Sequence, residues 1–170
     1  DQVDLTVTVT EKPTGNLLIG AGYSNAETLT LTAQIKQDNV FGSGNYLGIE
    51  VNTSNTNRTL VVSALDPYYT VDGVSRAIDV FYRTSRPFNS QGDAYQLATP
   101  GAAVRFGVPF TDFDTVFVGV GAEFTKIGAS TGIPNSYFLY REQSGATSWS
   151  LPLTLGWARD DRDSALVPTT

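Results

Sequence analysis

Acidic residues after the last apolar stretch of the chain have a spacing that is compatible with metal binding. Asp160, Asp161 and Asp163 lie close together, and carboxylate oxygens are the ligands that Ca2+ prefers. Arg159 and Arg162 are interleaved with these acids. Charges of alternating sign are more typical of a solvated turn. We favour the turn and predict no metal site.

Two short glycine motifs, Gly20-Ala21-Gly22 and Gly119-Val120-Gly121, resemble parts of phosphate-binding loops. Such a loop needs the full glycine spacing and a following helix whose N-terminus holds the phosphate. Neither motif has these features. We therefore interpret both as glycines within strands that face a crowded interior.

The residue types that most enzyme chemistry needs are missing. The chain has 0 Cys and 0 His, which excludes disulfides, thiol chemistry, Cys/His zinc sites and imidazole acid–base catalysis within this segment. We predict no enzyme and no cofactor. The net charge is −6 with only 11 Lys and Arg residues, so we also expect no nucleic-acid partner, since phosphate binding needs a basic surface.

The elements that would position any functional residue are strands. From Thr28 to Lys36, Leu29, Leu31, Ala33 and Ile35 alternate with polar residues, and alternation places the two sets on opposite faces of a strand. A soluble sandwich buries the apolar face against a second sheet, whereas a transmembrane barrel turns it to lipid. A length of 170 residues is enough for one domain. Because the chain has 0 Met, we expect it to be a mature chain or an excised piece.

The same period of two predicts eight strands in the main unit. Most are roughly 8–12 residues long, which is close to the ~9–11 residues that cross a bilayer at a tilt. A further alternating stretch, Val3 to Glu11, precedes them. The predicted strands are 16–23, 28–37, 45–53, 58–66, 75–84, 101–108, 115–126 and 146–159.

The connections between these strands also favour a barrel. Every second connection is compact (38–44, 67–73 and 109–114), and the remaining ones include two long polar segments (85–100 and 127–145). Short turns at one end and long loops at the other are typical of outer-membrane barrels. Aromatic residues near strand ends fit interfacial girdles; these are Phe41, Tyr68, Tyr69, Phe110, Phe113, Trp149 and Trp157.

A barrel assigns the apolar set to lipid and the polar set to the lumen. Charged lumen candidates of mixed sign could line a conduction path, but mixed signs more often indicate internal ion pairs; they are Lys36, Glu50, Asp79, Arg83, Arg105 and Glu123. The predicted lipid-facing residues are Leu29, Leu31, Ile35, Leu47, Ile49, Val51, Leu60, Val62, Ile78, Val80, Tyr82, Val104, Phe106, Val116, Val118, Val120, Trp149, Leu151, Leu153, Leu155 and Trp157.

Four motifs occur in a fixed order along the chain. They are VTEKPTGN (9–16), GAGY (20–23), QDNVFGSG (37–44) and DPYYTVDG (66–73). In this order and spacing they resemble the BamA family, the barrel-assembly factors of the Gram-negative outer membrane. The sequence DRDSALVPT (161–169) resembles the turn into the ninth strand of that family.

The resemblance implies an all-β, antiparallel, up-and-down transmembrane β-barrel, of which residues 15–170 would form the first eight of about sixteen strands. Residues 1–14 would be the last strand of a periplasmic POTRA domain and a linker. The implied function is the folding and insertion of β-barrel proteins in the outer membrane. The implied partners are unfolded barrel clients, the lipid bilayer, and accessory lipoproteins bound through POTRA domains that are mostly absent here.

The first predicted strand is the candidate site. In the resembled family this strand forms a weak lateral seam with the last one. Gly20 and Gly22 would weaken its pairing, and a free strand edge can template an incoming client strand. An ordinary barrel strand remains the alternative. The candidate residues are Asn16, Leu17, Leu18, Ile19, Gly20, Ala21, Gly22 and Tyr23.

Three other functions stay open at this point. One is a secretion pore of the same superfamily, which exports a soluble partner. The second is a self-contained eight-stranded barrel with a structural role, although the stretch from Val3 to Glu11 argues against it. The third is a soluble β-sandwich that binds a ligand. If the chain is half of a barrel, its free edge at the eighth strand should make it unstable alone.

Overall fold

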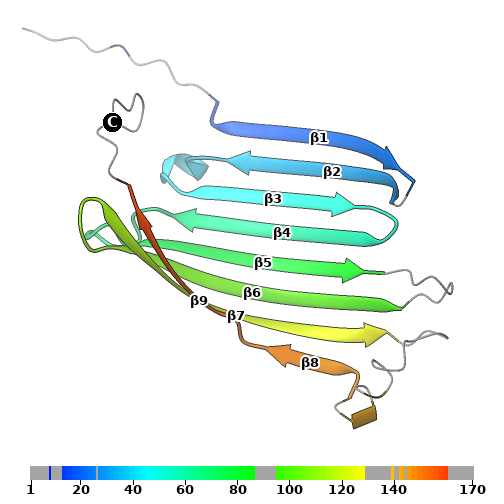
Figure 1. Ribbon diagram of the computed structural model, residues 1–170. Helices are drawn as coiled ribbons and strands as arrows, with labels where there is room; N and C mark the ends of the chain where they lie inside the picture. The colour runs from blue at the N-terminus through cyan, green and yellow to red at the C-terminus, as the bar shows by residue number, and fades with distance from the viewer. Residues whose placement is uncertain are drawn as a thin grey trace, which may run out of the picture.

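The protein forms a single antiparallel sheet (Figure 1). The computed structural model describes residues 8, 13–25, 27–86, 95–128, 139, 142–143 and 145–160. Neighbouring strands in the sheet follow chain order, and the last two strands both pair with β7. The elements are β1 Gly15–Ser24, β2 Thr28–Gln37, a 3-10 turn η1 Val40–Gly42, β3 Tyr46–Thr53, β4 Asn57–Asp66, β5 Ser75–Ser85, β6 Gln96–Pro109, β7 Asp114–Gly128, β8 Thr147–Ser150 and β9 Leu153–Arg159.

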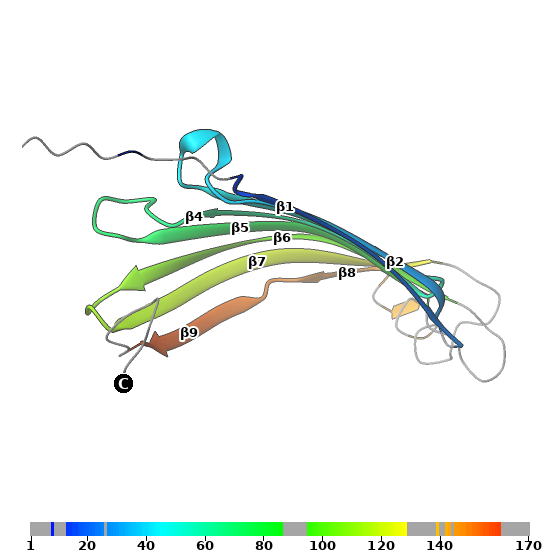
Figure 2. The same ribbon diagram turned by 90° about the horizontal axis from the view of Figure 1, so that it is seen from above.

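The sheet is a curved layer with no second layer packed on it in the described part of the chain (Figure 2). Among the described residues, Ile127 is the only buried apolar side chain, at 5% exposure, and no side chain is less than 2% exposed. A soluble sandwich would bury one whole face, so the sandwich alternative is wrong for this chain. No helix in the described ranges is long and apolar enough to span a membrane.

The up-and-down strand order was correctly predicted, with two differences in strand extent. β6 begins at Gln96 rather than Gly101, because Leu97 and Ala98 resume pairing with β7 beyond Pro100. The predicted eighth strand is divided into β8 and β9, since Pro152 has no N–H for the ladder. Its carbonyl still accepts a 2.9 Å hydrogen bond from the Gly121 N–H, so both pieces stay on β7. The stretch 3–11 lies outside the described residues apart from Thr8.

The strand register gathers the apolar side chains on one side of the sheet, here called the apolar face. Cross-strand partners share a face, and one such row runs through Ile35, Ile49, Val62, Val80 and Ala102 on β2 to β6. Much of this face is exposed, with Leu153 and Leu155 each 81% exposed. A large exposed apolar surface that extends over several strands is typical of a face that contacts a membrane or another protein. The predicted lipid contacts are consistent with this arrangement and remain predictions.

The opposite side, here called the polar face, holds the charged lumen candidates. Gln34 donates to Glu50 at 3.1 Å and Ser63 donates to Asp79 at 2.6 Å. Ser150 likewise donates to Glu123 at 2.9 Å. None of the six candidates forms an ion pair with another in the described chain. The described residues therefore do not form the expected internal ion pairs, because the register places neutral donors beside the carboxylates.

Aromatic rings on the polar face lie over glycines. Phe81 covers Gly101, its partner across the β5–β6 ladder, and Phe117 covers Gly107 across the β6–β7 ladder. A Cβ on Gly101 would overlap the Phe81 ring. The Arg83 guanidinium stacks on that ring, 4.2 Å from its centroid. Glycine is therefore required at both positions, because each aromatic ring lies close against the backbone of its glycine partner.

We expect Gly101→Ala to destabilise the protein by about 1–3 kcal/mol, because the added methyl must displace Phe81. Gly156→Ala is the matched control, since its Cβ would make only an ordinary contact, 3.7 Å from Phe117 Cβ. The measurement is urea unfolding of the full-length protein in detergent micelles, followed by heat-dependent gel mobility. Equal unfolding midpoints for the two variants would contradict the prediction.

Candidate functional site: the free edge of β1

β1 is the edge strand of the sheet. All ten of its residues, from Gly15 to Ser24, pair with β2 without interruption. No other described strand pairs with it (Figure 1). Leu17 and Ile19 are 68% and 76% exposed, more than the equivalent residues of inner strands. The predicted site therefore is a continuous strand with one unpaired side.

The hydrogen-bond pattern shows which backbone groups face the free side. Asp38 N–H donates to the Thr14 carbonyl at 3.0 Å, so Thr14 points toward β2. Because directions alternate in an antiparallel ladder, the backbone groups of Leu18, Gly20 and Gly22 also point toward β2. Those of Leu17 and Ile19 point away from it. Gly15, Ala21 and Tyr23 follow the same alternation and present the remaining free N–H and C=O groups.

Two kinds of strand glycine are distinguished by their surroundings. A Cβ built on Gly20 or Gly22 meets nothing within 4 Å. The prediction of crowding is wrong for this pair, because no described strand or large side chain lies over them. It is confirmed for Gly119 and Gly121, where a Cβ would lie 3.2 Å from the Val104 carbonyl and 3.0 Å from Pro152 Cγ, respectively. Gly20 and Gly22 therefore leave the polar side of β1 without side chains at these two positions, and no neighbouring group requires glycine there.

Polar contacts hold both ends of the β1–β2 hairpin. At the start of β1, Gln37 Nε2 donates to Thr14 Oγ1 at 2.6 Å. At the far turn, Asn57 Nδ2 donates to Glu27 Oε1 at 3.1 Å, and Asn55 N–H donates to the Glu27 carbonyl at 3.4 Å. Hydrogen bonds from Ser54, and then from Thr56 and Asn57, lower the pKa of Glu27 despite the opposing desolvation. The turn beside the free edge is thus tied to the β3–β4 turn.

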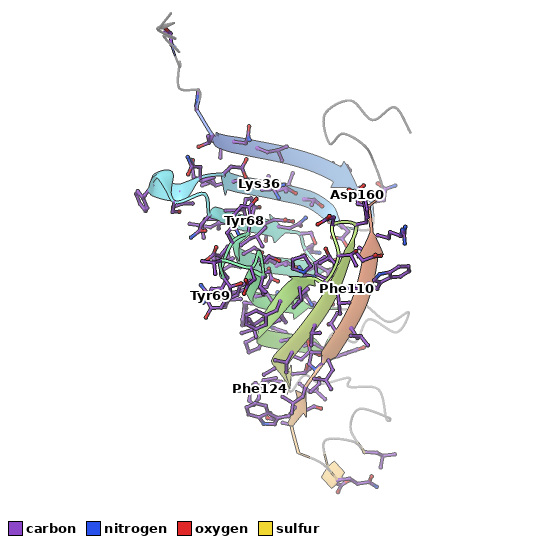
Figure 3. All side chains as sticks on the ribbon, turned by 90° about the vertical axis from the view of Figure 1, so that its left-hand side faces the viewer. Lys36, Tyr68, Tyr69, Phe110, Phe124 and Asp160 are labelled. Atoms are coloured by element: carbon purple, nitrogen blue, oxygen red, sulfur yellow. The ribbon has the colours of Figure 1, made fainter. Side chains whose placement is uncertain are left out.

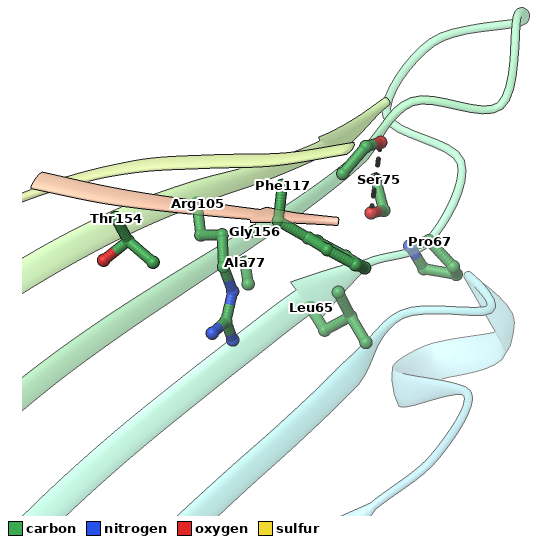
Figure 4. A pocket seen from close by; sticks show the side chains of 9 residues that line it. Leu65, Pro67, Ser75, Ala77, Arg105, Phe117, Thr154 and Gly156 are labelled. Atoms are coloured by element: carbon green, nitrogen blue, oxygen red, sulfur yellow. Dashed lines mark hydrogen bonds between the residues drawn. The ribbon is translucent and has the colours of Figure 1, made fainter. Parts of the chain in front are cut away.

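A second feature lies on the polar face near the short turns. Figure 4 shows Leu65, Arg105 and Phe117 bordering the same space, a hollow of about 540 Å³. Their side chains come from β4, β6 and β7. The sequence did not indicate this hollow, because its walls come together only through the register. Its apolar walls and single guanidinium provide no set of reacting groups.

The short-turn end carries the expected aromatic residues. Tyr68, Tyr69 and Phe110 lie at this end of the sheet (Figure 3). Trp157 Nε1 donates to Asp114 Oδ1 at 3.1 Å, and Arg159 lies 3.9 Å from the other oxygen of Asp114. No metal-binding cluster occurs among the described residues. Asp161 and Asp163 of the predicted acidic turn lie outside them.

Comparison with known proteins identifies the family of this sheet. The Omp85 superfamily domain matches residues 39–170. This chain belongs to the Omp85 superfamily. It is 34% identical to outer membrane protein assembly factor BamA of Neisseria meningitidis serogroup B over 99% of this chain and 22% of that protein. It is 27% identical to BamA of Nitratidesulfovibrio vulgaris over 99% of this chain and 20% of that protein.

A solved structure agrees with this assignment. Crystalline BamA from Haemophilus ducreyi, lacking POTRA domains 1–3, matches with a TM-score of 0.68 and 26% identity. The match covers 94% of this chain and 32% of that one. The Omp85 chain is therefore part of an outer-membrane β-barrel, and it spans about a fifth of the curated relatives' length. The resemblance seen in the sequence motifs is confirmed.

Acidification should loosen the turn that ends β1. Because the pKa of Glu27 is lowered in the folded protein, the turn contacts are fully present above the ordinary Glu range and are lost as the pH falls through the lowered pKa. Spin labels at Asn25 and Asn55 of the full-length protein should therefore give a broader distance distribution at low pH. The Glu27→Gln variant should show no such pH dependence. A distribution that broadens equally in this variant would contradict the assignment to Glu27.

Proposed function

We propose that this Omp85 chain forms part of a factor that folds and inserts β-barrel proteins into the bacterial outer membrane. Its similarity to BamA proteins over 99% of its length supports this role. The clients would be unfolded outer-membrane barrel proteins. Accessory lipoproteins would bind POTRA domains preceding residue 15, and no nucleotide would be needed. Residues 1–14 would then be the last strand of the final POTRA domain together with the linker to the barrel.

We propose further that β1 templates the client. The observation that carries this proposal is the uninterrupted register of β1 on β2 with its other side unpaired. Unpaired backbone groups are costly in the bilayer. They therefore favour any strand that can pair with them, and backbone pairing is largely independent of client sequence. The sparsely packed Gly20 and Gly22 would let the seam separate at low cost.

Proline substitution separates backbone pairing from side-chain contact. Ile19→Pro removes an N–H from the free side and leaves the N–H groups that face β2 in place. We expect client assembly by full-length protein in proteoliposomes to slow at least about fivefold, the effect of losing a hydrogen bond worth ~1 kcal/mol. Ile19→Ala keeps the N–H and should assemble clients at nearly the original rate.

The folded state of each variant is checked by heat-dependent gel mobility, so that a misfolded barrel is not mistaken for a failed template. If correctly folded Ile19→Pro protein assembles clients as fast as the original, the templating proposal is wrong. The general assembly role would stand in that case.

Disulfide crosslinking gives the register of the incoming strand. Cysteines would be placed from Leu17 to Tyr23 of the full-length protein, with partners along the last strand of a stalled client. Positions whose backbone points toward β2, such as Leu18, Gly20 and Gly22, form non-hydrogen-bonded pairs with a new antiparallel strand. Cβ atoms are closer in such pairs, so we expect these positions to crosslink more efficiently than Leu17, Ile19 and Ala21.

Efficient crosslinks only to the protein's own last strand would overturn the proposal. That outcome would indicate a closed barrel and favour a secretion pore or a structural barrel.

A further inference from the structure

A hollow of about 320 Å³ lies at the long-loop end of the sheet. Its polar lining includes Arg58, Arg86, Thr84 and Gln96, and its apolar lining consists of Val51, Leu60 and Tyr82. It therefore combines two guanidinium groups with an apolar floor. The proposed function does not use this site.

The register places the hollow on the apolar face. Arg58 pairs with Thr53 of β3 and Thr84 of β5, and that row continues through Ala98 to Lys126 of β7. The next row toward the middle of the strands contains Val51, Leu60 and Tyr82, which are 40%, 42% and 47% exposed. The two rows are about 7 Å apart. The basic groups thus lie just beyond the apolar band.

No described carboxylate lies within ion-pair distance of the basic side chains in this row. Neither Arg58 nor Lys126 forms an ion pair in the described part of the chain. Both are exposed on the side that the barrel turns to the bilayer. Long basic side chains are tolerated there only where their charged ends reach the headgroup level. An anionic group in the headgroup region would satisfy them.

The opposite end of the same face provides an internal comparison. Arg76 lies 3.9 Å from the Asp66 carboxylate and stacks on Tyr69 at 4.0 Å from the ring centroid. The protein therefore supplies its own partners for the arginine at the short-turn end. At the long-loop end it supplies a hollow instead, with two arginines beside it.

We propose that this hollow binds the phosphate group of a lipid headgroup in the leaflet at the long-loop end. Guanidinium groups bind phosphate oxygens through paired, charge-assisted hydrogen bonds. Arg58 and Arg86 hold the phosphate, and Thr84 and Gln96 add neutral polar groups. The acyl chains lie along Leu60, Val51 and Tyr82 toward the middle of the bilayer. Lys126, roughly 14 Å away across three strand spacings, raises the local positive potential.

The test uses the full-length protein in phosphatidylcholine nanodiscs that contain either phosphorylated lipid A or its dephosphorylated form. Native mass spectrometry then measures how many lipid A molecules remain bound. We expect retention of the phosphorylated form only, and about tenfold weaker binding for Arg58→Gln with Arg86→Gln. The single variant Arg58→Lys keeps the positive charge, so it should retain part of the binding that the double variant loses.

Arg83→Gln is the control for loss of an arginine in this region, because it removes one positive charge from β5, next to Thr84, but on the polar face. It should retain lipid A as the original protein does. Equal retention by the double variant, equal retention of dephosphorylated lipid, or equally tight binding of inorganic phosphate would each overturn the proposal. Heat-dependent gel mobility checks that each variant is folded. Client assembly is measured in a separate experiment, because lipid binding at this hollow does not depend on the proposed role of β1.

Discussion

Backbone hydrogen bonding between strands is the constraint on which this structure depends. In the hydrocarbon region no water can satisfy an unpaired N–H or C=O group. The inner strands meet this requirement through neighbours on both sides, whereas β1 at one edge and β8 and β9 at the other have a neighbour on one side only in the described sheet. Everything else follows from that ladder, since it fixes which side chains share a face and which backbone groups stay free. The outer side of β1 is therefore unpaired within the described sheet.

The side chains refine this ladder without forming an apolar core. On the polar face, rings lie over glycines and neutral donors satisfy carboxylates, as with Phe81 over Gly101 and Ser63 bonded to Asp79. These contacts link residues on adjacent strands and so reinforce the register. The apolar face has few comparable contacts among the described residues. The described sheet is therefore stabilised by hydrogen bonding between its strands and by contacts across the ladder rather than by interior packing.

Much of the fold was predictable from the sequence, because a period of two carries both strand position and face. Leu29, Leu31 and Ile35 identify β2 without knowledge of any neighbour. Features that depend on the neighbouring strand were not predictable in the same way. Mixed charges suggested ion pairs, but Gln34 lies opposite Glu50 in the register. The open surroundings of Gly20 and the crowded surroundings of Gly121 look alike in sequence and differ only in what lies over them.

The two edges of the sheet, β1 on one side and β8 with β9 on the other, differ in how completely they pair with the neighbouring strand. At β1 the ladder runs through ten consecutive residues without a proline. At the other edge, Pro152 divides the strand into β8 and β9. Its carbonyl accepts from the Gly121 N–H, so the N–H that proline lacks is missing from the ladder with β7. The two edge strands are therefore held differently. β1 pairs with β2 along its whole length, whereas β8 and β9 together lack one ladder hydrogen bond to β7 at Pro152.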